Sequence, residues 1–145
     1  MKRIVIIAVS LVMFSLTQLR ADDRPIKFSQ LPEAAQSFIN KYYQNDNVSF
    51  ATVDDDMIAP DYQVALVSGV MLQFHHNGKL EKIESRTTAI PKGIIPVQII
   101  EAIKELYPEA IDNAYEVDWN SHEVKLSNRM ELKFNNNYRI IELDD

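Results

Sequence analysis

The sequence predicts an α+β fold in which two helices pack on one face of an antiparallel sheet. Two observations carry this prediction: the chain contains the same pattern twice, and each copy combines one helical stripe with several alternating segments. Alternation of apolar and polar residues with a period of two is typical of strands with one buried and one open face. Apolar residues three and four positions apart form the buried stripe of a helix. We therefore expect two tandem repeats, each of one helix and about four antiparallel strands.

The repetition has two offsets. From Val64 onward the offset is 60 residues, so that Leu72 matches Leu132. Upstream the offset is 64, so that Pro32 matches Pro96 when "LPEAAQSFINKYY" is laid over "IPVQIIEAIKELY". The first copy therefore carries four extra residues, within "DDDMIAPD".

Each copy opens with a helix. Pro32 and Pro96 stand where proline is tolerated in the first turn, because the missing N–H has no intrahelical partner there. Pro108 prevents the second helix from continuing. The apolar stripes of the two helices consist of Ala35, Phe38, Ile39 and Tyr42 and of Ile99, Ala102, Ile103 and Leu106. Each stripe requires a partner, which the apolar face of the sheet supplies.

The remaining segments alternate as strands do, around residues 48–53, 62–67, 70–74 and 79–84 and around residues 111–117, 122–127, 130–134 and 139–143. A three-residue turn in the central hairpin of each copy places Val64 opposite Leu72 on one face. On the other face it sets opposite charges across from each other, Lys125 with Glu131 and Glu123 with Lys133. A two-residue turn would exchange the faces and set Leu126 against Glu131, so we exclude it.

The dipeptide Asn77–Gly78 predicts a further hairpin with a two-residue turn. Such a turn places Ile83 beside Leu72 on the buried face. It also places Leu80 beside His75 on the open face.

Residues 1–21 are typical of a secretory signal peptide, with a basic start, a short apolar core and Ala21 at the cleavage point. We therefore divide the chain into a signal peptide at 1–21, a first repeat at 22–86 and a second repeat at 87–145. A membrane anchor is disfavoured because polar residues follow the apolar core at once. The absence of cysteine excludes a lipoprotein anchor, disulfides and thiol chemistry.

Cleavage after Ala21 leaves twelve basic and 21 acidic residues, a net charge of −9. Such an acidic exported protein is a poor candidate for binding nucleic acid or anionic membrane. A basic exported or periplasmic protein is the partner that this charge favours.

The arrangement "LP…A…FI…YY" before "YQVALVSGVMLQFHHNGKLEKIE", followed by "IP…II…AI…LYP" before "HEVKLSNRMELKFNNNYRIIELDD", resembles a known family. It is similar to the PepSY-like, β-lactamase-inhibitor-like proteins exported by Bacteroides and relatives. The resemblance implies two tandem PepSY-like repeats, a periplasmic location and a binding or inhibitory role that uses a concave sheet. Two features depart from the pattern: the disulfides of β-lactamase inhibitor protein are impossible here, and Asn128–Arg129 replaces the usual Asn-Gly turn.

The open face differs between the two copies. In the second repeat it is charged, whereas in the first repeat it carries the uncharged positions Gln63, Ala65, Val67, Met71, Gln73, His75 and Leu80. Clustered exposed apolar residues mark interaction sites, and methionine adapts well to partner surfaces. We therefore predict partner binding at Ala65, Val67, Met71, Gln73, His75 and Leu80. The alternative is that a loop or the N-terminal segment "DDRPIKF" covers them.

Trp119, in the loop "DWNSH", is a further candidate for partner binding, because tryptophan is enriched among interface anchors. The alternative is that its ring caps the edge of the core.

No metal site, cofactor or catalytic residue is expected. His75 and His76 are adjacent on a strand and face opposite ways, and His122 lies near the buried face. The run Asp54–Asp56 with Asp61 lacks the glycine and terminal glutamate of an EF-hand loop. The sequence contains no GxSxG, HExxH or P-loop motif.

The sequence thus predicts a periplasmic, non-catalytic binding protein that inhibits an exported enzyme or peptidase by covering it with the open sheet face. The alternative function is a carrier or sensor of a small hydrophobic ligand. That alternative requires a cavity between helices and sheet, lined by Phe38, Tyr42 and Phe74.

Overall fold

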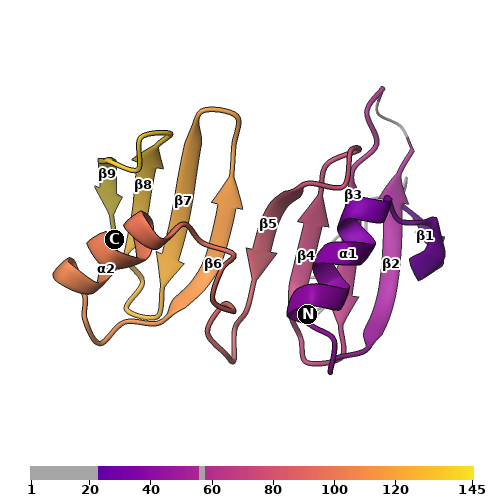
Figure 1. The fold of residues 1–145 in the computed structure, drawn as a ribbon, viewed down its shortest axis with the longest axis horizontal. Coiled ribbons are helices and arrows are strands. Elements are labelled where there is room, and N and C mark those ends of the chain that lie inside the picture. The colour runs from indigo at the N-terminus through magenta and orange to yellow at the C-terminus, as the bar shows by residue number, and fades with distance from the viewer. Residues whose placement is uncertain (1–22, 56–57) are drawn as a thin grey trace, which may run out of the picture.

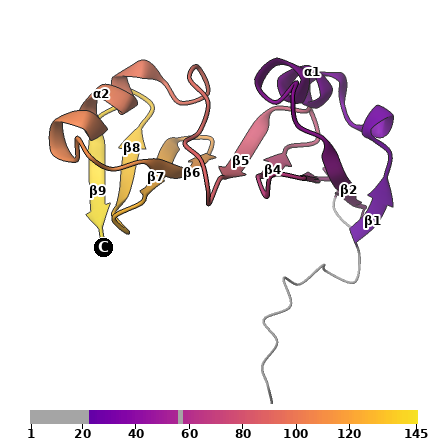
Figure 2. The ribbon, with the colours of Figure 1, turned by 90° about the horizontal axis from the view of Figure 1, so that it is seen from below.

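The computed structural model describes residues 23–55 and 58–145, which form one nine-stranded antiparallel sheet and two α-helices (Figure 1). The strands lie side by side in chain order, and both helices cover the same face (Figure 2). The predicted signal peptide lies outside the described residues. The elements are β1 (Asp23–Ile26), the 3-10 helix η1 (Phe28–Gln30), α1 (Glu33–Tyr42), β2 (Val48–Asp54), β3 (Tyr62–Leu66), β4 (Met71–Phe74), β5 (Leu80–Glu84), α2 (Val97–Leu106), β6 (Asp112–Val117), β7 (Ser121–Leu126), β8 (Glu131–Asn135) and β9 (Ile140–Asp144).

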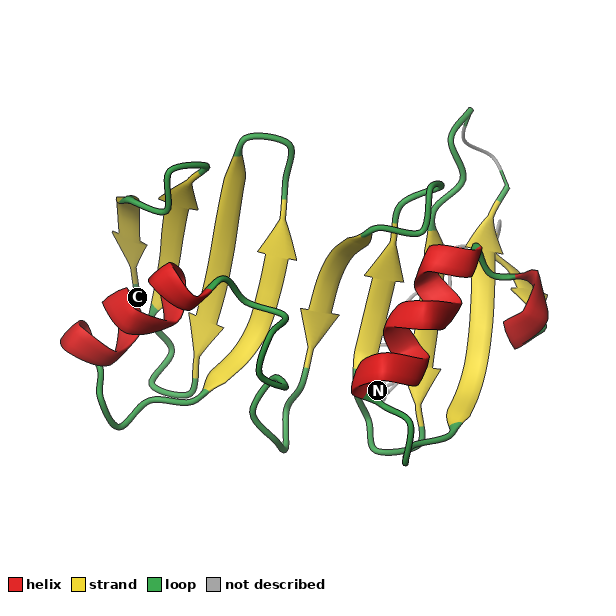
Figure 3. Ribbon diagram, viewed as in Figure 1, coloured by secondary structure: helices red, strands yellow, loops and turns green. Residues whose placement is uncertain are grey.

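The same order of elements occurs twice, a helix followed by four strands. In Figure 3 each helix lies across its own group of strands. The copies are α1 with β2–β5 and α2 with β6–β9. Strand β5 pairs antiparallel with β6, with Ile83 opposite Tyr115, so the two copies share one continuous sheet. The predicted α+β fold of two tandem repeats is confirmed. The loop between β2 and β3 is longer than that between β6 and β7, which places the four extra residues where the sequence indicated.

The two helices begin and end in the same way. Pro32 and Pro96 are the N-cap residues, one position before the first helical turn in which the sequence placed them. At the other end the N–H of Tyr43 donates to the carbonyl of Ile39 at 2.8 Å, and Tyr107 does the same to Ile103 at 2.7 Å. The residues that each helix buries most deeply belong to the predicted stripes: Ala35 and Ile39 in α1, and Ile99 and Ile103 in α2.

The core lies between these helices and the covered face of the sheet. Six of its completely buried side chains form pairs that are 60 residues apart: Val64 and Val124, Leu72 and Leu132, Phe74 and Phe134. Their burial is the main stabilising contribution, since the described chain holds no cysteine and hence no disulfide.

The register of the central hairpins is the predicted one. Val64 lies opposite Leu72, and Lys125 lies opposite Glu131 with their charged atoms 3.3 Å apart. The first turn uses Gly69 at φ +94°, and the second uses Arg129 at φ +71°. A left-handed backbone strains any residue with a side chain, so the second repeat tolerates a cost that glycine would avoid.

The hairpin at Asn77–Gly78 differs from the prediction. Ile83 does lie opposite Leu72, but the N–H of His75 donates to the carbonyl of Lys79 at 2.9 Å, which makes a three-residue turn with Gly78 at φ +81°. The pairing therefore shifts by one residue. Its consequence is a correction to the sequence analysis: Leu80 lies opposite Phe74 and packs against the core, not beside His75 on the open face.

The shift is a β-bulge, and the second repeat contains the same one. Leu80 and Lys82 both have partners on β4, so Glu81 between them is the extra residue. Ile141 is the corresponding extra residue of β9.

The described part of the N-terminal segment, from residue 23 onward, does not lie over the open face. Residues 23–26 form β1, which pairs antiparallel with β2 and extends the sheet sideways. None of the helices in residues 23–55 and 58–145 is long and apolar enough to cross a membrane.

The turn at Gly78 generates a test of how tightly the first helix packs. An alanine Cβ at Gly78 would lie 2.9 Å from the Cβ of Pro32 and 3.0 Å from the backbone nitrogen of Ala35, whereas at Gly69 it would meet nothing within 4 Å. Positive φ costs both alanine variants about 1 kcal/mol. Crowding adds roughly 1–3 kcal/mol for Gly78→Ala alone. Urea unfolding measures both losses, and equal losses would contradict this packing.

Candidate functional site

The open face of the sheet, opposite the helices in Figure 2, carries the predicted partner-binding residues of β3 and β4. Ala65 lies opposite Met71, and Gln63 lies opposite Gln73. Val67 is 68% exposed and Met71 is half-buried, but Ala65 is only 5% exposed. Val67 and Met71 are therefore the side chains that a partner could reach, and Ala65 forms the floor between them.

Strand β2 adds a residue that the sequence analysis missed. Phe50 lies opposite Ala65 on the open face and is 43% exposed. The signal was present in the alternation of β2: Ala51 and Val53 are buried, so their neighbours face the other way. We define the apolar strip as Phe50, Ala65, Val67 and Met71.

Charged residues border the strip on the side of the second repeat. The Nζ atom of Lys82 lies 3.1 Å from Oε1 of Glu84 and 3.8 Å from Oε2 of Glu116. Burial acts to lower the pKa of Lys82, but these two carboxylates more than offset it and raise the pKa above its usual value. The ammonium group stays charged, and the strip ends at a fixed ion-pair network.

The open face of the second repeat is charged and paired with itself. Glu123 lies opposite Lys133, as predicted, but its carboxyl group hydrogen-bonds to Glu131 on the diagonal. This hydrogen bond, burial and the charge of Glu131 raise the pKa of Glu123 to about 7. The same hydrogen bond, with help from Lys125, lowers the pKa of Glu131. Below about pH 7 Glu123 is therefore protonated and shares its proton with Glu131, which removes the repulsion between two carboxylates on adjacent strands.

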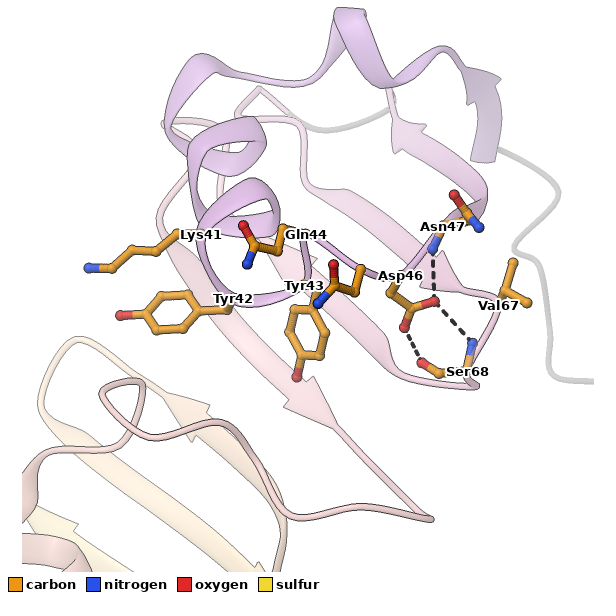
Figure 4. A pocket seen from close by; sticks show the side chains of 9 residues that line it. Lys41, Tyr42, Tyr43, Gln44, Asp46, Asn47, Val67 and Ser68 are labelled. Atoms are coloured by element: carbon orange, nitrogen blue, oxygen red, sulfur yellow. Dashed lines mark hydrogen bonds between the residues drawn. The ribbon is translucent and has the colours of Figure 1, made fainter.

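One end of the strip adjoins an open surface pocket of about 610 Å³, lined mostly by polar residues, between the end of α1 and the β3–β4 turn (Figure 4). Val67 and Ser68 line it from the turn. The Asp46 carboxylate accepts hydrogen bonds from the hydroxyl of Ser68 and from the N–H of Asn47 at 2.8 Å. The hydrogen bond from the Ser68 hydroxyl is the main cause of the lowered pKa of Asp46, which keeps a negative charge at the rim.

The residues expected to line a ligand cavity pack against one another instead. The ring of Phe38 lies 4.8 Å from the ring of Tyr42 and 5.6 Å from that of Phe74, centroid to centroid. Phe74 is completely buried. Aromatic side chains therefore fill the space between α1 and the sheet at this point.

Trp119 does not cap the core, because it is 86% exposed in the loop between β6 and β7. Antiparallel strands place this loop at the same end of the sheet as His75 and at the opposite end from Val67. The structure therefore does not bring Trp119 to the apolar strip. His75 faces β5, with its Nδ1 3.8 Å from Oε2 of Glu81.

The fold and the open face define a class: a small α+β protein of two tandem repeats in which the described elements cover only one face of the sheet. Comparison with known families identifies it further. The family model described as "Putative beta-lactamase-inhibitor-like, PepSY-like" matches residues 17–80 and again residues 60–142. The protein belongs to this family. A search of the curated proteins gave no match.

Solved structures agree with this assignment. A protein of Bacteroides thetaiotaomicron described as a "putative calcium-regulated periplasmic protein" is 35% identical, with a TM-score of 0.83 over 86% of this chain and 98% of the other. A "putative periplasmic protein" of Bacteroides vulgatus from the DUF2874 family is 32% identical, with the same TM-score over the same shares of the two chains. Another from that species is 25% identical, with a TM-score of 0.80 over 85% of this chain and 99% of the other. The expected periplasmic location is thereby confirmed.

The shared proton of Glu123 predicts a pH dependence of stability. The folded protein raises the pKa of Glu123 from 4.5 to about 7, so this contribution is fully present below pH 4.5 and is lost as the pH rises through 7. Glu123→Gln cannot ionise, so between pH 5 and pH 8 its unfolding free energy should fall less than that of the wild type. Because both carboxylates are half-exposed to water, screening limits the difference to ~0.5 kcal/mol.

Urea unfolding at both pH values measures this difference. Glu142→Gln, which removes an exposed carboxylate from the neighbouring strand β9, is the matched control. An equal pH dependence in all three proteins would contradict the shared proton.

Proposed function

We propose that the protein is a non-catalytic periplasmic binding module that inhibits an exported enzyme or peptidase by covering it with the apolar strip. The observation that carries this proposal is the contrast between the two repeats. They bury corresponding residues in the same register, yet Lys125 and Glu131 form an ion pair on one open face where Ala65 and Met71 stand on the other. The need to fold does not explain this difference.

The shape of the strip supports recognition of a protein surface. Phe50, Val67 and Met71 expose apolar side chains around the buried Ala65, and the ion pairs of Lys82 border them. An apolar centre with a polar rim is the usual anatomy of a protein interface. The mechanism is steric: a rigid sheet covers the partner and performs no chemistry on it.

Charge supports a basic partner. Without the predicted signal peptide the chain carries a net charge of −9, and the pocket beside Val67 holds the ionised Asp46. Opposite charge accelerates encounter and orients the two surfaces. The family description as inhibitor-like agrees with a function of this kind.

The two other functions have less support. A carrier of a hydrophobic ligand needs space where Phe38, Tyr42 and Phe74 are in ring contact. An enzyme needs polar groups that converge in a pocket. The most strongly raised carboxyl pKa among the described residues is that of Glu123, which lies on the charge-paired sheet and not in a pocket.

Lysine substitutions in the strip test the proposal. Met71→Lys and Val67→Lys place a charge at the proposed contact, so each should weaken binding of the captured partner by about tenfold or more. Affinity capture from a periplasmic extract, followed by titration of the recovered protein, measures this loss.

Asp144→Lys is the control, because it adds a lysine to the same face of the second repeat, opposite Glu131. It should bind as the wild type does. Unfolding curves of the three variants exclude loss of fold as the cause. Equal binding by all of them would place the interface elsewhere.

A further inference from the structure

Three side chains with metal-ligating groups meet at one end of the first repeat. Asp61 directly precedes β3, His75 directly follows β4, and Glu81 lies near the start of β5. One ligating atom from each lies within 4.8 Å of the others. The antiparallel order of the strands, not proximity in sequence, brings them together.

The β-bulge explains how Glu81 reaches this position. As the extra residue of β5 it has no partner in the ladder with β4, and its Oε2 lies 3.8 Å from Nδ1 of His75. That distance is too long for a hydrogen bond. Within the described part of the chain, Oε2 of Glu81 is buried and receives no hydrogen bond. A buried carboxylate oxygen without a donor is destabilising, and a cation would remove that cost.

The surroundings of Glu81 are negatively charged. Burial is the largest cause of its raised pKa, and the charges of Asp61, Glu116 and Asp118 raise it further. His75 is the group that acts in the opposite direction. A divalent cation at this point would be attracted by all four carboxylates.

We propose that Asp61, His75 and Glu81 form a binding site for a divalent cation of the zinc class. One imidazole and two carboxylates are a donor set that suits zinc, with water in the fourth position. Calcium instead prefers six to eight oxygen ligands, and magnesium prefers oxygen in an octahedron. The site therefore selects a metal that accepts nitrogen.

The required rearrangement is small. Donors that lie about 2.0–2.2 Å from a tetrahedral zinc ion are about 3.4 Å from one another. The present separations, at most 4.8 Å, must close by little more than an ångström. His75 opens a turn and Glu81 lies in a bulge, so both belong to segments that are not held by a regular ladder.

The second repeat lacks the site. Ser121, Asn135 and Ile141 occupy the positions that correspond to Asp61, His75 and Glu81 at the offset of 60 residues. A metal in the first repeat would tie the ends of β3, β4 and β5 together. This site does not depend on the proposed partner binding.

Zinc titration of the protein without a histidine tag tests the site. ZnCl₂ should raise the midpoint of thermal unfolding and compete with a chromophoric chelator at a 1:1 ratio, whereas CaCl₂ and MgCl₂ at the same concentration should leave the midpoint unchanged. His75→Gln and Glu81→Gln should each weaken zinc binding by at least about tenfold.

His76→Gln is the matched control, since His76 is the exposed neighbour of His75. It should bind zinc as the wild type does. Glu81→Gln keeps the side-chain shape, and without metal it should unfold no earlier than the wild type, which separates loss of the ligand from loss of the fold. Zinc binding that survives His75→Gln, an absent zinc response, or calcium binding that depends on His75 and Glu81 would each overturn the proposal.

Discussion

The structure depends on one constraint: the apolar face of the sheet must be covered, and each repeat supplies a single helix to cover it. The first helix approaches so closely that only a glycine fits beneath its start, with Gly78 under Pro32. In the second repeat Tyr138 takes the place of Gly78, at φ +60°, and its ring lies 5.4 Å from the ring of His122. His122 in turn hydrogen-bonds to the hydroxyl of Tyr115 at 2.7 Å. The corresponding turn position therefore has no side chain in the first repeat and an aromatic ring in the second.

Both helices lie on one face, and within residues 23–55 and 58–145 no helix or strand covers the other face or pairs with the outer edges of β1 and β9 (Figure 2). At the junction of the repeats β6 covers the edge of β5, and Ile83 is completely buried there. Strand β9 is the counterpart of β5 but pairs with β8 alone in the described sheet, and Leu143, which corresponds to Ile83, is 50% exposed. The first edge differs again, because β1 extends the sheet beyond β2. Position within the array, more than residue type, therefore decides how far corresponding residues are buried.

The sequence was sufficient to predict what periodicity determines. Residue spacing predicts the repeat, the helices and the core pairs such as Leu72 and Leu132. The central hairpins follow from the rule that paired strands keep their apolar residues on the same face of the sheet. The sequence was insufficient where a single extra residue shifts the register between two strands, as it does between β4 and β5. Asn77–Gly78 suits a two-residue turn, but a three-residue turn with a bulge also places glycine at positive φ, and the choice moved Leu80 to the core. The meeting of Asp61, His75 and Glu81 depends on that bulge, so no motif in the sequence indicated it.

In a protein of two repeats, the open face of each repeat can differ while both keep the covered face that folding requires. A single repeat needs its covered face for folding, and the corresponding core residues show that both copies keep that requirement. Folding places no such requirement on the open face, because charged side chains there are solvated by water. Exposed apolar side chains such as Val67 and Phe50 contribute little to folding and favour unwanted association. In the second repeat Ser127 stands at the position of Val67, and the ion pair of Lys125 and Glu131 stands at the positions of Ala65 and Met71. A negatively charged chain that keeps apolar side chains on this face in one copy bears the cost of a surface that only a partner would offset.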